Sequence, residues 1–107
     1  MMLCIADEVG TFAENKERAK ELRSRYILPC IKKGEEVELN FENVSLATQS
    51  FVHALIAQAI RSRGDALDLL EFQNCSPNVQ SIIEVVVSYC QDQWDAGMGG
   101  GAERARS

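Results

Sequence analysis

The chain has 107 residues, of which 46% are hydrophobic and 25% are charged. This length suits one domain with one modest core and leaves no room for separate cofactor and substrate domains. The formal net charge of -5 argues against a protein that binds nucleic acid over its whole surface, because phosphate contacts require a basic footprint. No apolar run approaches the length of a membrane span, and the first residues lack the basic region of a signal peptide. We therefore expect a cytoplasmic protein that binds neither nucleic acid nor membranes.

The cysteine spacing does not indicate a metal or redox site. Cys4, Cys30, Cys75 and Cys90 are far apart and form no CxxC pair. Zinc sites use paired spacings, and secreted disulfide scaffolds are denser in cysteine. We interpret the four thiols as small buried hydrophobes, with a redox or metal role as the alternative. The sequence also lacks glycine-rich phosphate loops and the HExxH or DxDxDG metal spacings, so we expect no cofactor and no metal.

The first third of the chain predicts a strand and then a long helix. Residues 1–6 form an apolar run that is typical of a buried strand. From Glu14 onward the apolar residues recur at spacings of three and four, which predicts a helix. Pro29 should kink or split this helix near Leu28, and Gly34 suits the position just past its end.

This helix concentrates positive charge in an acidic protein. Residues 16–33 contain seven basic residues and two acidic ones, Glu17 and Glu21, which leaves a local charge of +5. The basic residues are Lys16, Arg18, Lys20, Arg23, Arg25, Lys32 and Lys33. The i,i+4 spacing predicts an ion pair of Glu14 with Arg18 and another of Glu21 with Arg25. Two interpretations stay open: a solvated helix laced with ion pairs, or a basic face for an acidic or phosphate-bearing partner.

The middle of the chain first alternates and then becomes continuously apolar. In residues 36–42, apolar and polar side chains alternate strictly, which predicts a half-buried strand in a sheet with one open face. The glutamates of this strand are interpreted as its solvated side rather than as catalytic acids. After a loop at 43–49, residues 50–63 are apolar on nearly every side. This pattern predicts a buried helix that begins at Ser50 and stops at Gly64.

The remaining segments complete an alternating order of elements. Residues 67–72 predict a short strand, and Ser76-Pro77 suits the cap and first turn of a last helix that should end near Gln93. Residues 95–107, DAGMGGGAERARS, hold four of the seven glycines and predict a flexible tail. The order strand, helix, strand, helix, strand, helix predicts an α/β fold. We expect a single small domain at 1–94 with a largely parallel or mixed sheet.

Two side chains near the start of the 50–63 helix are candidates for chemistry. His53 is the only histidine and a candidate general base. No serine, cysteine or aspartate beside it has the local signature of a nucleophile, so a structural or surface-edge histidine is the alternative and no enzyme is expected. Ser50, or alternatively Thr48, stands at a helix start, where unpaired backbone N–H groups favour a phosphate. Ser50 is the candidate phosphoacceptor, or simply the helix cap.

A family resemblance rests on residues 36–58, EVELNFENVSLATQSFVHALIAQ. The alternating strand supplies Val37, Leu39 and Phe41, and the helix start supplies Thr48-Gln49-Ser50-Phe51. This arrangement resembles the STAS domain family, which includes the bacterial anti-sigma-factor antagonists. In the antagonists, a strand of the form hydrophobic-x-Leu-x-Leu leads through a loop to Asp-Ser-Ser-Gly at a helix start. The second serine of that motif is the phosphoacceptor, and it falls on Ser50.

Further segments extend the resemblance over most of residues 5–90. The chain is more closely similar to the short bacterial STAS-like proteins of uncharacterised function, which share the elements Leu28-Pro29, Ser50-Phe51 and Phe72-Gln73-Asn74. It departs from the antagonists at two points of the motif. Thr48 stands at the antagonists' aspartate position, and Phe51 stands at their glycine position.

The resemblance implies a non-enzymatic regulatory module that binds a protein partner of the kinase-like ATPase type, with a phosphate on Ser50 as its switch. The contact surface it implies is the helix start, with the residues Thr48, Gln49, Ser50, Phe51 and His53. The alternative function is a sensor of a small anionic ligand or nucleotide, which the basic helix could meet. A homodimer stays open, because an uncovered sheet face favours one and a glutamate-rich face disfavours it.

Overall fold

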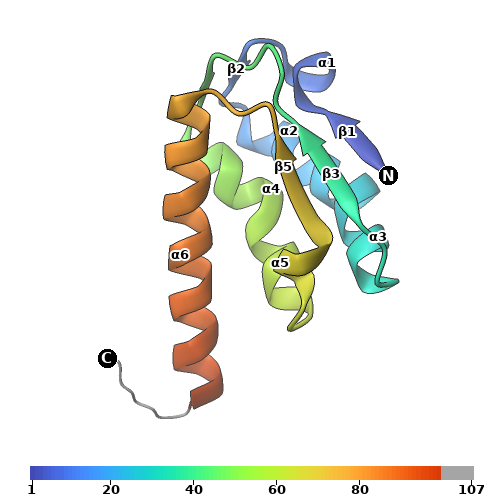
Figure 1. Cartoon of the computed structure of the whole chain (residues 1–107), viewed down its shortest axis with the longest axis vertical. Coiled ribbons are helices and arrows are strands. Elements are labelled where there is room, and N and C mark those ends of the chain that lie inside the picture. The colour runs from blue at the N-terminus through green and yellow to red at the C-terminus, as the bar shows by residue number, and fades with distance from the viewer. Residues whose placement is uncertain (100–107) are drawn as a thin grey trace.

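The computed structural model (Figure 1) contains two parallel sheets and describes the backbone of residues 1–99 and the side chains of residues 1–90. The larger sheet has three strands in the order β1-β3-β5, with the bounds Met2–Cys4, Val37–Asn40 and Leu70–Gln73. The smaller sheet pairs β2 (Phe12–Ala13) with β4 (Leu46–Ala47). All of these strand pairs are parallel, so the predicted α/β class is confirmed.

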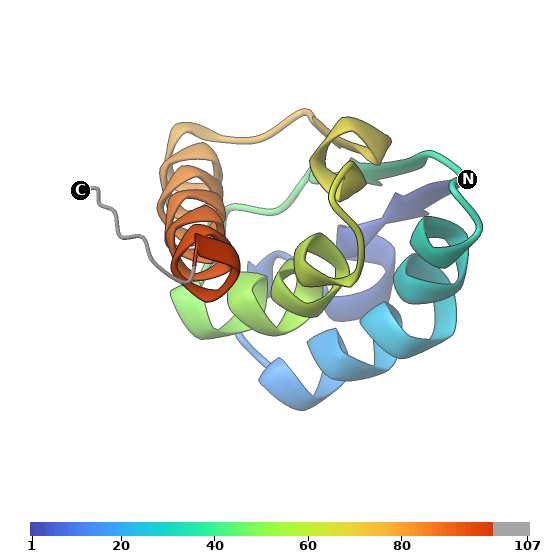
Figure 2. The same cartoon turned by 90° about the horizontal axis from the view of Figure 1, so that it is seen from below.

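Helices α2, α3 and α4 lie on one side of the central sheet, and α6 lies beside α4 (Figures 1 and 2). The helical elements are α1 (Ile5–Val9), α2 (Lys16–Leu22), the π-helical turn η1 (Arg23–Ile27), α3 (Leu28–Lys32), α4 (Gln49–Ser62), α5 (Ala66–Leu69) and α6 (Pro77–Gly99). Along β3, Val37 and Leu39 are fully buried while Glu38 and Asn40 are half-buried. The half-buried strand predicted from the alternation is confirmed.

The core lies between the central sheet and this helix layer. Its largest fully buried side chains include Phe41, Phe51 and Leu22, which come from the loop after β3, from α4 and from α2. Among the described side chains no polar or charged residue is buried. Burying an aromatic or branched side chain of this size contributes about 1.5–3 kcal/mol, so apolar packing is the main source of stability.

The chain enters the helix α1 where the sequence predicted that the first strand would continue. Strand β1 ends at Cys4, and α1 runs from Ile5 to Val9. Asp7 and Glu8 lie in its first turn, where negative charge interacts favourably with the helix dipole. Gly10 then ends the helix with a φ of 82°, a left-handed conformation that glycine adopts without strain.

The predicted helix at 14–33 is a chain of three helical segments. Asn15 caps α2, because its Oδ1 accepts hydrogen bonds from the backbone N–H groups of Glu17 and Arg18 at 3.0 and 3.2 Å. Pro29 has no N–H and its ring crowds the carbonyl four residues earlier, which disfavours a regular α-helix there. The wider turn η1 precedes it, and α3 begins at Leu28, where the sequence predicted a split.

The segment predicted as a strand at 67–72 is half helix and half strand. Ala66–Leu69 form the short helix α5, and β5 begins only at Leu70, opposite Val37 of β3. The Phe72-Gln73-Asn74 segment, which the family resemblance includes, forms the end of β5 and the turn after it. Asn74 adopts a left-handed φ of 57°, and its Nδ2 donates to Asn40 Oδ1 at 3.0 Å, which ties the end of β5 to the end of β3.

Helix α6 begins as predicted and ends later than predicted. Ser76 Oγ accepts a hydrogen bond from the backbone N–H of Val79 at 3.2 Å, so Ser76 caps the helix. The helix continues past Gln93 to Gly99 and so includes the first residues of the predicted tail. The rest of that tail, residues 100–107, lies outside the described residues, and the domain boundary at 94 stays a prediction.

The cysteines agree with their interpretation as small packing residues. Cys90 is buried, the other three are half-buried, and all four are free. Burial raises the pKa of the Cys75 and Cys90 thiols, which keeps them protonated and unreactive. Within residues 1–90, no cluster of histidine, cysteine and carboxylate side chains is arranged to hold a metal ion. None of the helices within residues 1–99 is long and apolar enough to cross a membrane.

Candidate functional site

Helix α4 is capped by Thr48, and not by Ser50 as one reading of the sequence held. Thr48 Oγ1 accepts a hydrogen bond from the backbone N–H of Phe51 at 3.1 Å, and Gln49 is the first helical residue. The strand pairing sets this position. Ala47 pairs with Ala13, and the backbone N–H of Thr48 donates to the Ala13 carbonyl at 3.0 Å, so the chain leaves the sheet at Thr48. The Ser50 hydroxyl is left exposed in the first turn.

The residues predicted for the contact surface separate into exposed and buried members. Thr48, Gln49 and Ser50 are exposed, and His53 is half-buried. Phe51 is 0% exposed and packs in the core, so a partner on the surface does not reach its side chain. In the Ser50-Phe51 pair of the sequence motif, the serine is therefore exposed to solvent and the phenylalanine is buried in the core.

His53 faces an aromatic ring rather than a catalytic partner. Its ring centroid lies 6.0 Å from that of Tyr89 on α6, with an angle of 55° between the ring planes. This tilted geometry is a favourable aromatic contact and joins α4 to α6. Among the described side chains, no hydroxyl, thiol or carboxylate lies within hydrogen-bond distance of His53 as a nucleophile or an orienting group.

The exposed side of α4 forms the floor of a groove of about 780 Å³, which we call the basic groove. Its floor comes from α4, one wall from α2 and η1, and the other from α6; Figure 2 shows α4 between the other helices. The lining residues are Lys16, Lys20, Arg23, Gln49, Ser50, His53, Ala54, Ala57, Gln58, Arg61, Val86 and Tyr89. The predicted Ser50 and His53 thus lie in one groove with part of the basic helix.

Among residues 1–90, the lining of the basic groove carries positive charge. Four of these lining side chains are lysine or arginine, and none of them is aspartate or glutamate. Lys20 Nζ lies 3.4 Å from Glu17 Oε2, but both side chains are exposed, so this pair compensates little. In a protein with a net charge of -5, this is a local field that attracts anions.

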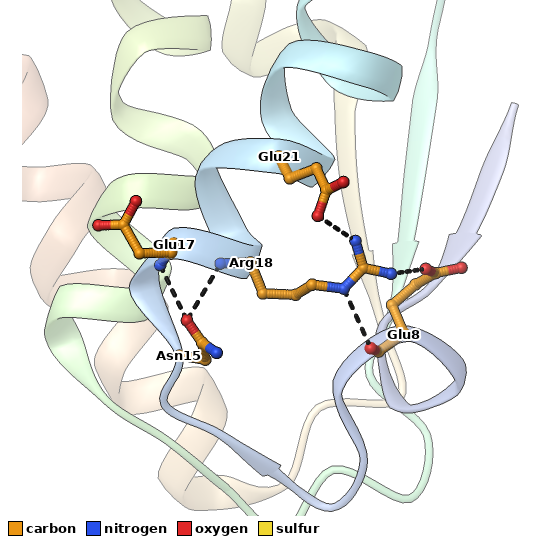
Figure 3. Close-up of polar contacts among 5 residues, drawn as sticks. All are labelled: Glu8, Asn15, Glu17, Arg18 and Glu21. Atoms are coloured by element: carbon orange, nitrogen blue, oxygen red, sulfur yellow. Dashed lines mark hydrogen bonds and ion pairs between the residues drawn. The ribbon is translucent and has the colours of Figure 1, made fainter.

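The ion pairs of Arg18 on α2 differ from those predicted and involve no residue of the groove lining. Arg18 pairs with Glu8 of α1 at 2.7 Å and with Glu21, and its Nε donates to the Glu8 carbonyl (Figure 3). Neither the Glu14–Arg18 pair nor the Glu21–Arg25 pair is present among the described residues. The capping of α2 at Asn15 leaves Glu14 outside the helix, and the π-helical turn changes the i,i+4 alignment beyond Leu22.

Arg23 stands where α2 passes into η1 and is fixed toward α4. Its Nη1 donates to the Ala54 carbonyl at 3.1 Å. Its Nε is buried and has no acceptor among the described residues. A buried donor without an acceptor costs about 1–3 kcal/mol, so the side chain is held here in spite of an energetic penalty. Both this penalty and the π-helical turn are features that concentrate at functional sites.

An exposed apolar pair lies just before α4. Phe12 of β2 is the register partner of Leu46 of β4, and these side chains are 56% and 50% exposed. Adjacent apolar side chains on a surface favour contact with another protein. They precede the first turn of α4 directly, because β4 leads into Thr48.

Sequence reasoning identified the basic helix and the Ser50 region but did not bring them together. The groove also contains Tyr89 of α6, which the sequence pattern placed in the apolar stripe of the last helix, and Arg61 at the far end of α4; neither was predicted as a site residue. Arg61 lies on the same helix as Ser50, whereas Tyr89 is far from Ser50 in the sequence and reaches this surface through the packing of α6 beside α4. No local pattern in the sequence marks the groove, because Ala54 and Ala57 of its floor are 8% and 2% exposed and resemble core residues.

Comparison with known proteins identifies a family. A family model described as a STAS-like domain of unknown function matches residues 18–80. This match covers more than half of the chain and includes η1, the start of α4 and most of the groove floor. No curated protein and no solved structure matches the chain.

Proposed function

Because the chain belongs to the family of STAS-like domains of unknown function, we propose that it is a non-enzymatic regulatory module that acts by binding a partner protein. The observation that carries the proposal is the basic groove beside the exposed first turn of α4. Its surface has a charge opposite to that of the whole protein, and such complementary fields speed and orient association. The contacts of His53 support binding over catalysis, since its neighbour is the Tyr89 ring.

The partner that we propose is a protein of the kinase-like ATPase type, as the resemblance to antagonists implies. The contact surface consists of Thr48, Gln49, Ser50 and His53, and it continues into the groove. Phe12 and Leu46 add an apolar contact next to it. We further propose a cytoplasmic location and no direct contact with nucleic acid or membranes.

A phosphate on Ser50 is the switch that we propose for this contact. It would add about -1.5 to -2 charges at pH 7 to the first turn of α4. Lys16 and Lys20 line the same groove and are available to pair with it. Since Thr48 provides the cap, the Ser50 hydroxyl can be modified without loss of the capping hydrogen bond. The phosphate would neutralise part of the groove and weaken the binding of an acidic partner.

The test is a pull-down from native cytoplasm with three baits: wild type, Ser50→Glu and Ser50→Ala. We expect the wild type and Ser50→Ala to recover the same partner, Ser50→Glu to lose it, and mass spectrometry to find phosphate on part of the wild-type bait. Equal recovery by all three baits, with no phosphate, would contradict the switch and leave a constitutive binding module. An empty pull-down with all three would contradict the interaction proposal.

A second candidate function is a sensor of a small anionic ligand or a nucleotide. The four cationic side chains of the groove support it, because phosphate groups favour arginine and lysine. A ligand present at 100 times its Kd would stabilise the fold by about 2.7 kcal/mol, which a thermal shift detects. A flat response of the wild type to a panel of nucleotides would rule this candidate out.

A further inference from the structure

We propose that the basic groove is the docking site for an acidic amphipathic helix of the partner protein. This inference rests on the proposed function and adds the chemistry of the segment that binds. The shape of the groove is the first argument. It follows α4 from Gln49 to Arg61, a path of about 18 Å at 1.5 Å per residue. Ala54 and Ala57 are small and 8% and 2% exposed, so the longer side chains of the walls, and not the floor, present the surface that a docked helix contacts.

The spacing of the cations is the second argument. Lys16, Lys20 and Arg23 lie at positions i, i+4 and i+7, so they form a stripe along one wall over about 10 Å. A helix with carboxylates at the same spacing matches this stripe one to one. A compact anion such as inorganic phosphate binds best where several cations converge on one point. On a stripe of this length it would pair with one part and leave the other cations unpaired.

The opposite wall supplies the apolar part of the interface. Tyr89 of α6 lines it and is 48% exposed, whereas Val86 beneath it is 1% exposed and belongs to the core. Aromatic side chains with this exposure are typical anchors of protein interfaces. The docked helix therefore presents its acidic residues to α2 and its apolar residues to α6.

The composition of the walls favours a helical occupant over an extended one. An extended peptide binds by adding a strand to a sheet edge and needs free backbone groups. The walls and floor of the groove come from helices, whose backbone N–H and C=O groups beyond the first turn of α4 are already paired within each helix. Recognition must therefore use side chains, as in other complexes in which a helix binds a groove.

The position of Ser50 links this groove to the proposed switch. Ala13 pairs with Ala47, and Lys16 and Ser50 each follow their strand by three residues. Both side chains line the groove and stand at the same end of it. A phosphate on Ser50 would occupy the position of the first carboxylate of the docked helix. The switch and the docked helix would then compete for the same cations.

The experiment uses the full chain and a displayed library of helical peptides about 16 residues long, which is enough for a stable helix. We expect enrichment of peptides with acidic residues at i, i+4 and i+7 beside an apolar stripe. The best peptide is then measured by fluorescence anisotropy against Lys16→Glu/Lys20→Glu and against Lys32→Glu/Lys33→Glu. The second variant makes the same charge change at exposed positions outside the groove.

The expected result is a loss of at least about tenfold in affinity for Lys16→Glu/Lys20→Glu and less than about twofold for Lys32→Glu/Lys33→Glu. Circular dichroism confirms that both variants are folded. Enrichment of basic or non-helical peptides, equal losses in the two variants, or full displacement of the peptide by one equivalent of ATP would overturn the inference. The proposed function and the docked helix can fail separately. If Ser50→Glu loses a partner in the pull-down and any of these results is also obtained, the proposed function stands and the docked helix is rejected.

Discussion

Helix α4 has two faces that are built from different kinds of residue. The inner face holds Phe51, Leu55 and Ile56, each 0% exposed, and packs against the central sheet. The outer face holds Ser50 and His53 beside small alanines and forms the floor of the basic groove. Packing volume determines the inner residues, whereas charge and small size characterise the outer ones. One helix thus separates the positions that stabilise the fold from those available for binding.

Helix α2 shows the same separation within one residue type. Arg18 lies between α1 and α2 and pairs with Glu8 and Glu21, so its charge is compensated within the fold (Figure 3). Lys16 and Lys20, on the same helix, line a groove in which no carboxylate is found among the described side chains. Net charge alone does not distinguish these uses. The surroundings of each cation decide whether it contributes to stability or to recognition.

The largest expected effect is on the inner face. Phe51→Ala should lower the free energy of unfolding by about 3–5 kcal/mol, because it leaves a cavity in the core. Urea denaturation measures the change. Phe12→Ala is the matched control, since Phe12 is 56% exposed, and it should change the stability by less than about 0.5 kcal/mol. Similar losses in both variants would contradict the assignment of Phe51 to the core.

The next largest effect on stability is expected at Arg18, whose charge is compensated by Glu8 and Glu21. Arg18→Ala should cost about 1–2 kcal/mol, since it removes charge-assisted hydrogen bonds between partly buried groups. Arg25→Ala is the control, because Arg25 is exposed and its predicted pair with Glu21 is not formed. It should stay within about 0.5 kcal/mol of the wild type. If the two variants lost the same stability, the ion-pair network of Arg18 would have no structural role.

The parts of the fold that the sequence predicted are those with long periodic patterns. Alternation around Val37 and Leu39 identified the central strand, and the Ser76-Pro77 signal identified the start of α6. The strands β2 and β4 were missed because two residues are too short for a period to be visible. Helix α1 was missed because its apolar residues continue those of β1 without interruption.

The candidate site was predictable only in its separate parts. The charge of the basic helix and the Ser50 region were visible in the sequence. Which serine or threonine caps α4 depends on where β4 leaves its partner strand, and that is a tertiary contact. The groove itself requires Tyr89 and Arg61 to come together with Lys16, which follows from helix packing and not from local pattern.

A smaller effect distinguishes the cap of α4 from its exposed neighbour. Thr48→Ala should destabilise the protein by about 1 kcal/mol, because it removes the hydrogen bond to the Phe51 N–H. Ser50→Ala should change the stability by less than about 0.5 kcal/mol, since the Ser50 hydroxyl is exposed. Thermal unfolding of both variants, with Thr48→Ser as the conservative replacement, measures the difference. A larger loss for Ser50→Ala than for Thr48→Ala would return the cap to Ser50.

The smallest expected effect on stability is that of removing two lysines from the basic groove. Lys16→Ala/Lys20→Ala should change the stability by less than about 0.5 kcal/mol, because among the described residues these lysines form one ion pair, the exposed one between Lys20 and Glu17. Neighbouring cations repel each other and are separated by less than the Debye length of about 10 Å at 0.1 M salt. Salt screens this repulsion, which only the wild type contains. A rise in ionic strength should therefore increase the free energy of unfolding of the wild type relative to that of the variant. A loss as large as that of Arg18→Ala would instead show that the groove lysines stabilise the fold, and it would remove the reason to assign them to a partner.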